Sequence, residues 1–299
     1  MKDPSWFAAF TGGQVLQNEE LKKHTTFKIG GPADVFIVPE NIAALALAVR
    51  LCRENDVPYF LLGKGSNVLF GDKGFRGAVI STEKLCRYAL LDGDRIEAEA
   101  GADLKDVCEF ALANGLTGLE FACGIPGSVG GATFMNAGAY DGELKNIVAS
   151  VTVLLPDNSH CEISQNDMDF GYRKSLVQRE HHVALRTVFQ LQKGSTDDIA
   201  AKMADLTEKR EAKQPLETPS AGSTFKRPEG HFAGKLIMDA GLRGYSIGGA
   251  RVSEKHCGFV VNKGDATAAD VLTLIAHVRE TVHAASGVWL EPEVRLIGE

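Results

Sequence analysis

The sequence is most distinctive at Gly124-Ile-Pro-Gly-Ser-Val-Gly-Gly-Ala-Thr-Phe-Met-Asn-Ala-Gly-Ala-Tyr140, a run of glycines and small residues without any Lys or Arg. The glycines at 124, 127, 130 and 131 let successive backbone N–H groups turn toward one point and approach a ligand, because no Cβ intervenes. Such a concave run of amides binds an anion without basic side chains. An ordinary glycine-rich loop is the alternative, but the length of the run and the nearby Phe121 and Phe134 favour a pyrophosphate site.

The composition is that of a globular protein large enough for two or three domains, with 299 residues, 44% hydrophobic and 24% charged. The 32 basic and 39 acidic residues give a net charge of −7, which argues against a nucleic-acid partner or an anionic membrane surface. No apolar run approaches the roughly 18 residues that a membrane span needs. An anionic ligand must therefore be held locally.

The six cysteines contain no C-x-x-C pair, so the sequence predicts neither a zinc site nor a disulfide framework, and no metal is expected. Cys52 and Cys108 fall on the apolar faces of predicted helices, where a thiol behaves as a small hydrophobic group. Lys2, Asp3 and Pro4 precede only a short, broken apolar patch, so no signal peptide is expected. These features predict a cytoplasmic enzyme.

A second glycine turn, Gly63-Lys-Gly-Ser-Asn67, follows a predicted strand–helix–strand unit formed by residues 34–38, 41–54 and 59–62. Proteins with such α/β units place ligands at the carboxyl ends of their strands. The turn lacks the third glycine of a Rossmann fingerprint, and no G-K-[ST] of a P-loop is present. The two glycine loops are instead expected to hold one extended dinucleotide.

The remaining elements are predicted from periodicity and turn residues. Strands are expected at 78–81, 95–100, 147–155, 160–163, 183–191 and 257–261, and helices at 103–114, 235–240, 267–285 and from Ser195, the cap, to Pro215. Residues 214–232 are rich in Pro and Gly and mark a domain boundary. The end of the chain alternates, placing Val288, Leu290, Val294 and Leu296 on one side and Glu291, Glu293 and Arg295 on the other.

Six ordered motifs carry a resemblance to a known family. They are Leu62-Gly-Lys-Gly-Ser-Asn-Val-Leu69, Gly124-Ile-Pro-Gly-Ser-Val-Gly-Gly131, Asn136-Ala-Gly-Ala-Tyr140, Tyr172-Arg173, Ala221-Gly-Ser-Thr-Phe-Lys226 and Leu290-Glu-Pro-Glu-Val294. Together they resemble the UDP-N-acetylenolpyruvoylglucosamine reductase family, in order from about His24 to Gly298.

The resemblance implies an α+β protein with an FAD-binding fold of the vanillyl-alcohol-oxidase/PCMH type in two subdomains and a C-terminal α/β substrate-binding domain. The implied domains are residues 1–83, with 293–299 returning to them, then 84–214 and 215–292. The implied activity uses NADPH to reduce FAD and makes UDP-N-acetylmuramate for the bacterial cell wall from an enolpyruvyl UDP-sugar. A monomer is expected.

Three residues match the family's catalytic positions: Ser223 as the proton donor, Arg173 and Glu293. An isolated hydroxyl is a poor acid, so Ser223 needs an environment that relays or replaces its proton. The Arg173 guanidinium can fork onto the substrate carboxylate and the enolate that grows from it. Glu293 would help an enolate if protonated, or if its charge is offset by a neighbour such as Arg295.

The implied FAD contacts lie along both glycine loops: Gly63, Lys64, Gly65, Ser66, Asn67, Gly124, Ile125, Gly127, Ser128, Gly130, Gly131, Asn136, Ala137, Gly138, and also Arg295. Ser66, Asn67, Ser128 and Asn136 are expected to supply side-chain hydrogen bonds. No Gly-Gly-His tether occurs in these loops, so FAD is expected to bind non-covalently. The implied substrate contacts are Tyr172, Lys213, Lys226 and Arg227.

Two departures and three rival interpretations accompany the resemblance. The segment after Ser175 reaches the strand at Val183 without the inserted tyrosine loop of the longer class, which indicates the short-loop class. Arg227 stands where the longer class has asparagine.

A non-catalytic or an oxidase-type flavin-binding protein of the same fold is one kind of alternative. The other is a serine acyl-transferase, because Ser223-Thr-Phe-Lys226 fits S-x-x-K, although Pro228 leaves little room for the helix that such a serine begins.

Overall fold

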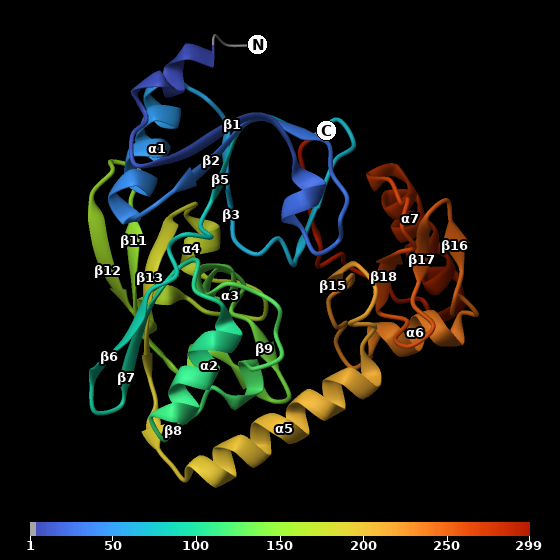
Figure 1. Cartoon of the computed structure of the whole chain (residues 1–299). Coiled ribbons are helices and arrows are strands. Elements are labelled where there is room, and N and C mark those ends of the chain that lie inside the picture. Colours follow the sequence, from blue (N-terminus) through green and yellow to red (C-terminus); the bar gives the residue numbers. More distant parts are fainter. Residues whose placement is uncertain (1–3) are drawn as a thin grey trace. The chain divides into compact units, whose positions relative to one another are not determined.

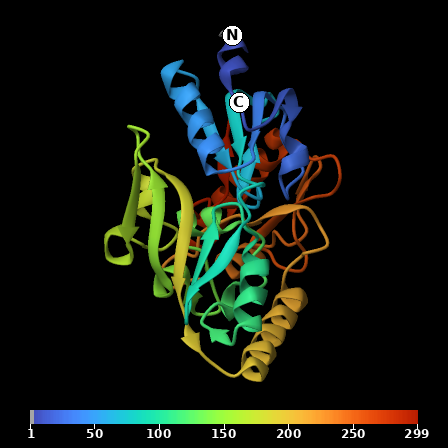
Figure 2. The same cartoon turned by 60° about the vertical axis from the view of Figure 1, so that its left-hand side comes forward.

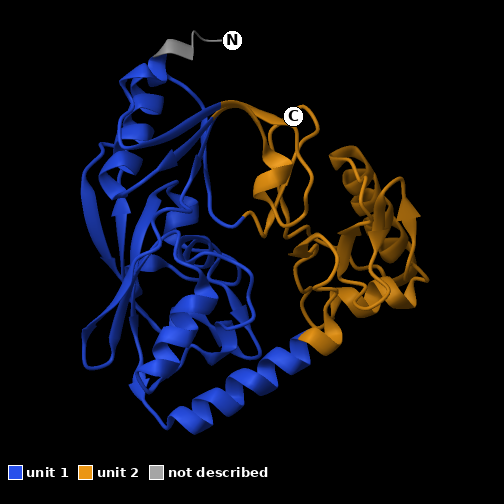
Figure 3. Cartoon of the chain, viewed as in Figure 1, with its two compact units in different colours: residues 1–16, 36–64, 78–210 blue, residues 17–35, 65–77, 211–299 orange. Residues whose placement is uncertain are grey.

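The computed structural model of the chain describes residues 4–299, and these form two compact units (Figure 3). Of the described residues, unit 1 comprises 4–16, 36–64 and 78–210, and unit 2 comprises 17–35, 65–77 and 211–299. The chain passes between the units within the strands β1 (Gly13–Glu20), β2 (Pro32–Pro39) and β5 (Phe75–Ser81). These strands form a four-stranded sheet of order β1-β2-β5-β3, in which β3 (Tyr59–Leu62) lies parallel to β5.

The predicted strand–helix–strand unit is confirmed. Helix α1 (Ile42–Glu54) follows β2, and the Asn41 side chain accepts a hydrogen bond from the Ala44 N–H at 2.9 Å, as a helix cap does. The apolar stripe of α1 is buried, and β4 (Val68–Phe70) follows the glycine turn. The turn therefore lies at the carboxyl end of β3, where a ligand site is expected.

Unit 1 also contains a five-stranded antiparallel sheet of order β12-β11-β13-β7-β6 (Figures 1 and 2). Its strands are β6 (Tyr88–Asp92), β7 (Arg95–Glu99), β11 (Val148–Leu154), β12 (His160–Ser164) and β13 (Val183–Gln190). Helices α2 (Leu104–Ala113) and α3 (Val129–Met135) contribute to the same core as the inward side chains of this sheet. The strands predicted at 147–155, 160–163 and 183–191 are confirmed as antiparallel neighbours.

Helix α3 was not expected, because its sequence is the centre of the glycine-rich stretch. Glycine lowers helix propensity by about 1 kcal/mol relative to alanine, so Gly130 and Gly131 argue against a helix. The helix forms because Ser128 caps it and because Val129, Ala132 and Thr133 are buried against the sheet. The second glycine loop is therefore a turn leading into a short helix.

Helix α5 (Thr196–Lys213) closes unit 1, and the Ser195 hydroxyl accepts a hydrogen bond from the Asp198 N–H at 3.4 Å, as predicted. The shorter elements of the described chain complete the list. They are β8 (Leu116–Thr117), β9 (Gly138–Ala139), β10 (Gly142–Glu143), α4 (Leu176–Arg179), β14 (Gln192–Lys193) and 3₁₀ helices at Pro4–Ala9, Leu21–His24, Glu120–Ala122, Leu144–Asn146 and Gln165–Met168.

Unit 2 has its own core between a four-stranded sheet of order β15-β18-β17-β16 and helices α6 (Ala233–Asp239) and α7 (Ala268–Ser286). The strands are β15 (Ser220–Ser223), β16 (Ser246–Ile247), β17 (Ala250–Val252) and β18 (Phe259–Asn262). Thr267 and Asp270 form a reciprocal capping box at the start of α7. Phe27 and Ile29, from the N-terminal part of the chain, are buried in this core, so unit 2 is discontinuous in sequence.

The predicted alternation at the end of the chain is wrong. Only Arg295–Ile297 forms a strand, β19, which pairs in parallel with β4, and Leu296 is 50% exposed although the predicted alternation placed it on the same side as Leu290, which is buried. Pro292 has no N–H to donate, so a continuous ladder cannot run through it. Leu290 alone of the four apolar residues is fully buried.

Cys52 and Cys108 are buried, as predicted, and the six thiols of the described residues are free. Burial raises the pKa of the Cys52 thiol to about 12, so this side chain behaves as an inert apolar group. Between residues 4 and 299, no helix is long and apolar enough to cross a membrane.

Candidate functional site

The two glycine loops meet in unit 1 at Gly63 and Ser128. A Cβ on Gly63 would lie 2.3 Å from the Ser128 hydroxyl oxygen, so a side chain there would displace the hydroxyl that caps α3. Lys64 forms an ion pair with Asp103, and Asp103 in turn forms a β-bridge with Ser128. The residues that begin the first turn are thereby attached to the start of α3.

The glycines of the second loop differ in how much space surrounds their backbones. A Cβ on Gly124 would lie 2.9 Å from Cδ of Arg210, and one on Gly130 would lie 2.7 Å from Cβ of Ala100, so close packing within the protein explains both. Gly131 is open, because its nearest neighbour would be the capping oxygen of Ser128 at 3.4 Å. Gly131 is therefore where a ligand can come closest to the backbone.

Asn136 ends α3 in the left-handed conformation with φ of 43°, and its side chain is almost completely buried. Its amide nitrogen donates to the Glu143 carboxylate at 2.9 Å and to the Gly171 carbonyl at 3.0 Å, while its oxygen accepts from the Lys145 N–H at 2.9 Å. Both amide hydrogens are thus directed to the protein. We infer that Asn136 orders the loops around the site instead of donating to a ligand.

The bond from Asn136 to Gly171 holds the turn that carries Tyr172 and Arg173. A bridge between Gly171 and Lys174 closes this turn, and Arg173 adopts φ of 57°, which is uncommon for a residue with a Cβ. The Arg173 guanidinium carbon lies 5.3 Å from the centre of the Tyr172 ring, and that ring is 52% exposed. Strained residues of this kind cluster at functional sites.

In unit 2, the second half of the first glycine turn is braced by the segment around His24. Gly65 has φ of 63°, and a Cβ there would lie 2.3 Å from the His24 carbonyl oxygen. The Thr26 N–H donates to the Gly65 carbonyl at 3.2 Å, and the Thr26 hydroxyl donates to the Ser220 carbonyl at 2.7 Å. Thr26 therefore joins the Gly65 turn to the strand that leads to Ser223.

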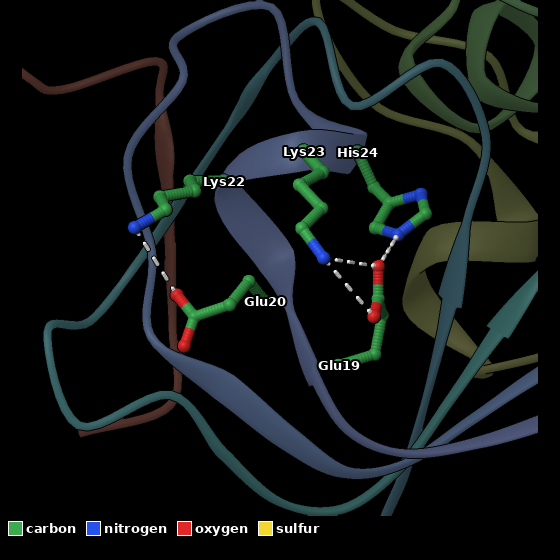
Figure 4. A network of polar contacts seen from close by, with 5 residues as sticks. All are labelled: Glu19, Glu20, Lys22, Lys23 and His24. Carbon is green, nitrogen blue, oxygen red and sulfur yellow. Dashed lines mark hydrogen bonds and ion pairs between the residues drawn. The ribbon is translucent and has the colours of Figure 1, made fainter.

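A surface network supports this segment (Figure 4). The Glu19 carboxylate accepts from His24 at 3.0 Å and from Lys23 at 3.3 Å, while Lys22 pairs separately with Glu20 at 3.4 Å. The hydrogen bond from His24 is the main cause that lowers the pKa of Glu19 below its ordinary value.

Ser223 is the last residue of β15 and follows Gly222, whose φ is 73°. The Thr224 N–H donates to the Gly258 carbonyl at 2.8 Å, and the Thr224 hydroxyl accepts from the Val260 N–H at 2.9 Å. These bonds fix the backbone directly after Ser223. Residues 224–229, which follow Ser223, are not helical, so Ser223 does not begin the helix that an S-x-x-K acyl-transferase requires, and that alternative is excluded.

The segment carrying Glu293 and Arg295 runs beside β15 and the first glycine turn. The Glu293 N–H donates to the Thr224 carbonyl at 2.8 Å, and the Arg295 N–H donates to the Asn67 carbonyl at 3.1 Å. Unit 2 thus brings Asn67, Ser223, Glu293 and Arg295 together. Burial lowers the pKa of Arg295, but a guanidinium remains charged at neutral pH.

The predicted substrate cations of unit 2 differ in their surroundings. Lys226 forms an ion pair with Glu291, and the Arg227 guanidinium carbon lies 4.1 Å from the centre of the Phe232 ring. Lys213 is exposed at the end of α5. Lys226 and Arg227 are therefore held by partners, whereas Lys213 faces solvent.

Two residues of these surroundings were missed by the sequence interpretation: Thr26 and Arg210. Nothing in the sequence signals Thr26, since its contacts are with distant parts of the chain. Arg210 could have been noticed in the sequence, because it lies at helical spacing from Ile199, Met203 and Leu206. The structure shows that its side chain is buried. A charged residue at a core-facing helix position calls for an explanation.

Two family models match the chain. The FAD binding domain matches residues 33–164, and the C-terminal domain of UDP-N-acetylenolpyruvoylglucosamine reductase matches residues 214–297. The chain is 52% identical over 284 residues to the reductase of that name from Clostridium perfringens (strain SM101 / Type A), covering 95% of this chain and 93% of that protein. The chain belongs to the UDP-N-acetylenolpyruvoylglucosamine reductase family.

Other members of the UDP-N-acetylenolpyruvoylglucosamine reductase family agree with this assignment. The protein from Clostridium botulinum (strain Eklund 17B / Type B) is 49% identical over 286 residues, covering 96% of this chain and 94% of that protein. The crystal structure of the Thermus caldophilus reductase superposes with a TM-score of 0.82 at 34% identity, covering 95% of this chain and 98% of that chain. The expected α+β fold, a PCMH-type FAD-binding domain with the family's C-terminal domain, is confirmed.

The residues of unit 1 fit the FAD of this reductase family. Gly131 has open space beside its backbone, where a ligand can approach closely. The first N–H groups of α3 are already bonded within the protein, those of Val129 and Gly130 to carbonyls and that of Gly131 to the Ser128 hydroxyl. Lys64 and the buried Arg210 supply positive charge near an otherwise uncharged stretch. Within residues 4–299, no group of three or more His, Cys, Asp or Glu side chains is arranged to hold a metal ion.

Proposed function

We propose that this protein uses NADPH and FAD to reduce the enolpyruvyl group of an enolpyruvyl UDP-N-acetylglucosamine, giving UDP-N-acetylmuramate for peptidoglycan precursors. Membership of the reductase family over nearly the whole chain and the matched FAD binding domain support this function. The observation that carries the chemistry is the position of Ser223 beside the Glu293 segment, fixed by the bond from Glu293 to Thr224.

FAD, when bound, supplies the hydride that NADPH provides and that the terminal carbon of the enolpyruvyl group receives. Addition of hydride leaves a negative charge on the adjacent carbon, and this charge is delocalised onto the carboxylate as an enolate. The residues of the chain then stabilise this charge. We assign Arg173 to that carboxylate, because a guanidinium can fork onto two oxygens. A fixed positive charge where the negative charge develops lowers the barrier of such a step.

Ser223 donates its hydroxyl proton to the carbon that bears the ether oxygen, which completes the reduction of the double bond. The alkoxide that remains on Ser223 must recover a proton from its surroundings. Glu293 is an acidic residue of the neighbouring segment, and its backbone lies next to that of Thr224. We assign to Glu293 the role of a hydrogen-bond donor in its protonated form, because a carboxylate would repel the enolate.

We assign the nucleotide part of the substrate to Tyr172, Lys213, Lys226 and Arg227. Lys213 is exposed and supplies a cation for the diphosphate, while Lys226 and Arg227 reach the same anion only by exchanging the partners that hold them. We assign FAD to Gly63, Lys64, Gly65, Ser66 and Asn67, to the stretch from Gly124 to Gly138, and to Arg295. We also propose that the protein acts in the cytoplasm, binds FAD non-covalently and is a monomer.

The test is an anaerobic single turnover. The purified holoenzyme is reduced with NADPH until its flavin absorbance bleaches, and enolpyruvyl UDP-N-acetylglucosamine is then added. The proposal predicts that the absorbance returns and that UDP-N-acetylmuramate forms in an amount equal to the flavin. An inert flavin-binding protein would not bleach, and an oxidase would recover its absorbance with oxygen but not with the UDP-sugar. Either result would overturn the proposal.

A further inference from the structure

Helix α5 is solvated along most of its surface, but one stripe of residues at helical spacing faces the protein. Ile199 and Arg210 are buried, and the half-buried Met203 and Leu206 between them pack on the core of unit 1. Arg210 ends the stripe and is only 7% exposed. An arginine thus occupies a position where an apolar side chain would complete the packing.

The Arg210 guanidinium contacts both ends of the glycine-rich stretch. Its Nη1 donates to the Gly124 carbonyl, and the Tyr140 side chain interacts with the guanidinium and opposes the lowering of its pKa by burial. The stem of Arg210 crosses directly over Gly124, since a Cβ there would lie 2.9 Å from Cδ and 3.2 Å from Nε. Gly124 is therefore required by Arg210.

Stability alone does not explain a buried arginine at this position. Within residues 4–299, no carboxylate pairs with Arg210, and burial lowers its pKa although the group remains charged at neutral pH. Replacing a buried charged group with an apolar side chain of similar size is often neutral or stabilising. The contacts of Arg210 indicate that it fixes the conformation of residues 124–140.

We propose that Arg210 is a positioning residue for FAD. Its guanidinium holds the first residue of the stretch, Gly124, beside the last, Tyr140, and so fixes the conformation of the backbone between them. A lysine cannot replace it, because a single ammonium lacks the planar pair of donors. This inference rests on the proposed placement of FAD along residues 124–138.

The experiment measures how fast FAD leaves the holoenzyme after dilution, followed by the fluorescence of the released flavin. Arg210→Met keeps the length and the packing of the stem but removes the fork. We expect about tenfold faster release or more, the effect of losing a charge-assisted hydrogen bond. We also expect an unfolding midpoint of the FAD-free protein that is unchanged or raised. Tyr140→Phe removes one contact and should accelerate release by a smaller factor.

Two further variants separate fork geometry from charge and packing. Arg210→Lys keeps the charge, so it should release FAD about as fast as Arg210→Met. Leu206→Met changes the packing of the same face of α5 without altering the Arg210 guanidinium, and it should release FAD at the wild-type rate. Arg210→Met and Tyr140→Phe should not be additive when combined, because both break the same connection.

The proposal is overturned if folded Arg210→Met or Tyr140→Phe holds FAD as long as the wild type, or if Arg210→Lys does. It is also overturned if faster release in Arg210→Met is matched by a lower unfolding midpoint of the FAD-free protein, because Arg210 would then only stabilise the fold. If Arg210→Met does not fold, Tyr140→Phe decides by the same measurement. Gly131→Val tests the FAD placement separately: its loss of FAD supports the site, and full retention removes both the site and the role of Arg210.

Discussion

The N–H of Glu293 donates to the carbonyl of Thr224 over 2.8 Å, so the backbone of Glu293 lies beside the residue that follows Ser223. An isolated β-bridge between Phe225 and Pro292 and a 2.8 Å bond from the Lys226 N–H to the Glu291 carbonyl continue the same contact. The proposed proton donor and the proposed acidic residue therefore sit on two neighbouring backbone segments. Their relation does not depend on side-chain conformation.

Replacement of Glu293 tests the form in which it acts. If the enolate needs a neutral hydrogen-bond donor, Glu293→Gln retains one and should lose much less activity than Glu293→Ala, for which we expect a fall in kcat of about 10²-fold or more. The measurement is steady-state kcat at saturating NADPH, with Glu254→Gln as a control elsewhere in unit 2. Equal losses in the glutamine and alanine variants would show that the charge or proton of Glu293 is required.

Lys213→Ala tests the nucleotide site. Losing one modest charge-assisted contact, worth about 1.4 kcal/mol, should raise KM for the UDP-sugar roughly tenfold. Bleaching of the flavin by NADPH should be nearly unchanged. Lys209→Ala is the matched control, because Lys209 lies one turn earlier on the same helix, exposed and paired with Asp205. A parallel loss of flavin reduction in Lys213→Ala would assign Lys213 to the cofactor or the fold.

The Glu19 network predicts a pH-dependent contribution to stability. The partners of Glu19 lower its pKa in the folded protein below the ordinary 4.5, so the stabilisation is fully present above that value and is lost as the pH falls through the folded pKa. Glu19→Gln should reduce the free energy of unfolding at about pH 7 by up to about 1 kcal/mol, as expected for a partly exposed pair.

Urea unfolding of both proteins at neutral and acidic pH checks this expectation. The difference between Glu19→Gln and the wild type should shrink as the carboxylate protonates. Glu20→Gln serves as the control, because its pair with Lys22 is more exposed and should contribute little. A difference that stays constant down to low pH would mean that the charge of Glu19 plays no part.

Local elements of this fold could be predicted because their signals are local. Ser195 caps its helix as expected, and the strands at 147–155 and 183–191 pair as expected. Helix α3 was missed because its stability comes from tertiary burial, which outweighs the low helix propensity of its two glycines. The end of the chain was misjudged because an alternating pattern does not reveal that Pro292 interrupts pairing.

The candidate site was predictable as a set of residues but not as a geometry. The motifs named Ser223 and Glu293, yet the bond that places them on neighbouring segments joins residues about seventy positions apart. The open backbone at Gly131 and the crowded one at Gly124 look alike in the sequence and differ only through packing against Ser128 and Arg210. Side chains that act by holding other residues carry no motif of their own.

The proton donor is tested most directly by stopped-flow absorbance of both half-reactions in Ser223→Ala, with Ser220→Ala as a control on the same strand. The account predicts that NADPH bleaches the flavin of Ser223→Ala at close to the wild-type rate, since no enolate forms in that step. Return of the absorbance with the UDP-sugar should slow by at least about 10²-fold, and Ser223→Cys should recover part of the rate because a thiol is a stronger acid than an alcohol. Normal return of the absorbance with normal product formation in Ser223→Ala would contradict the account.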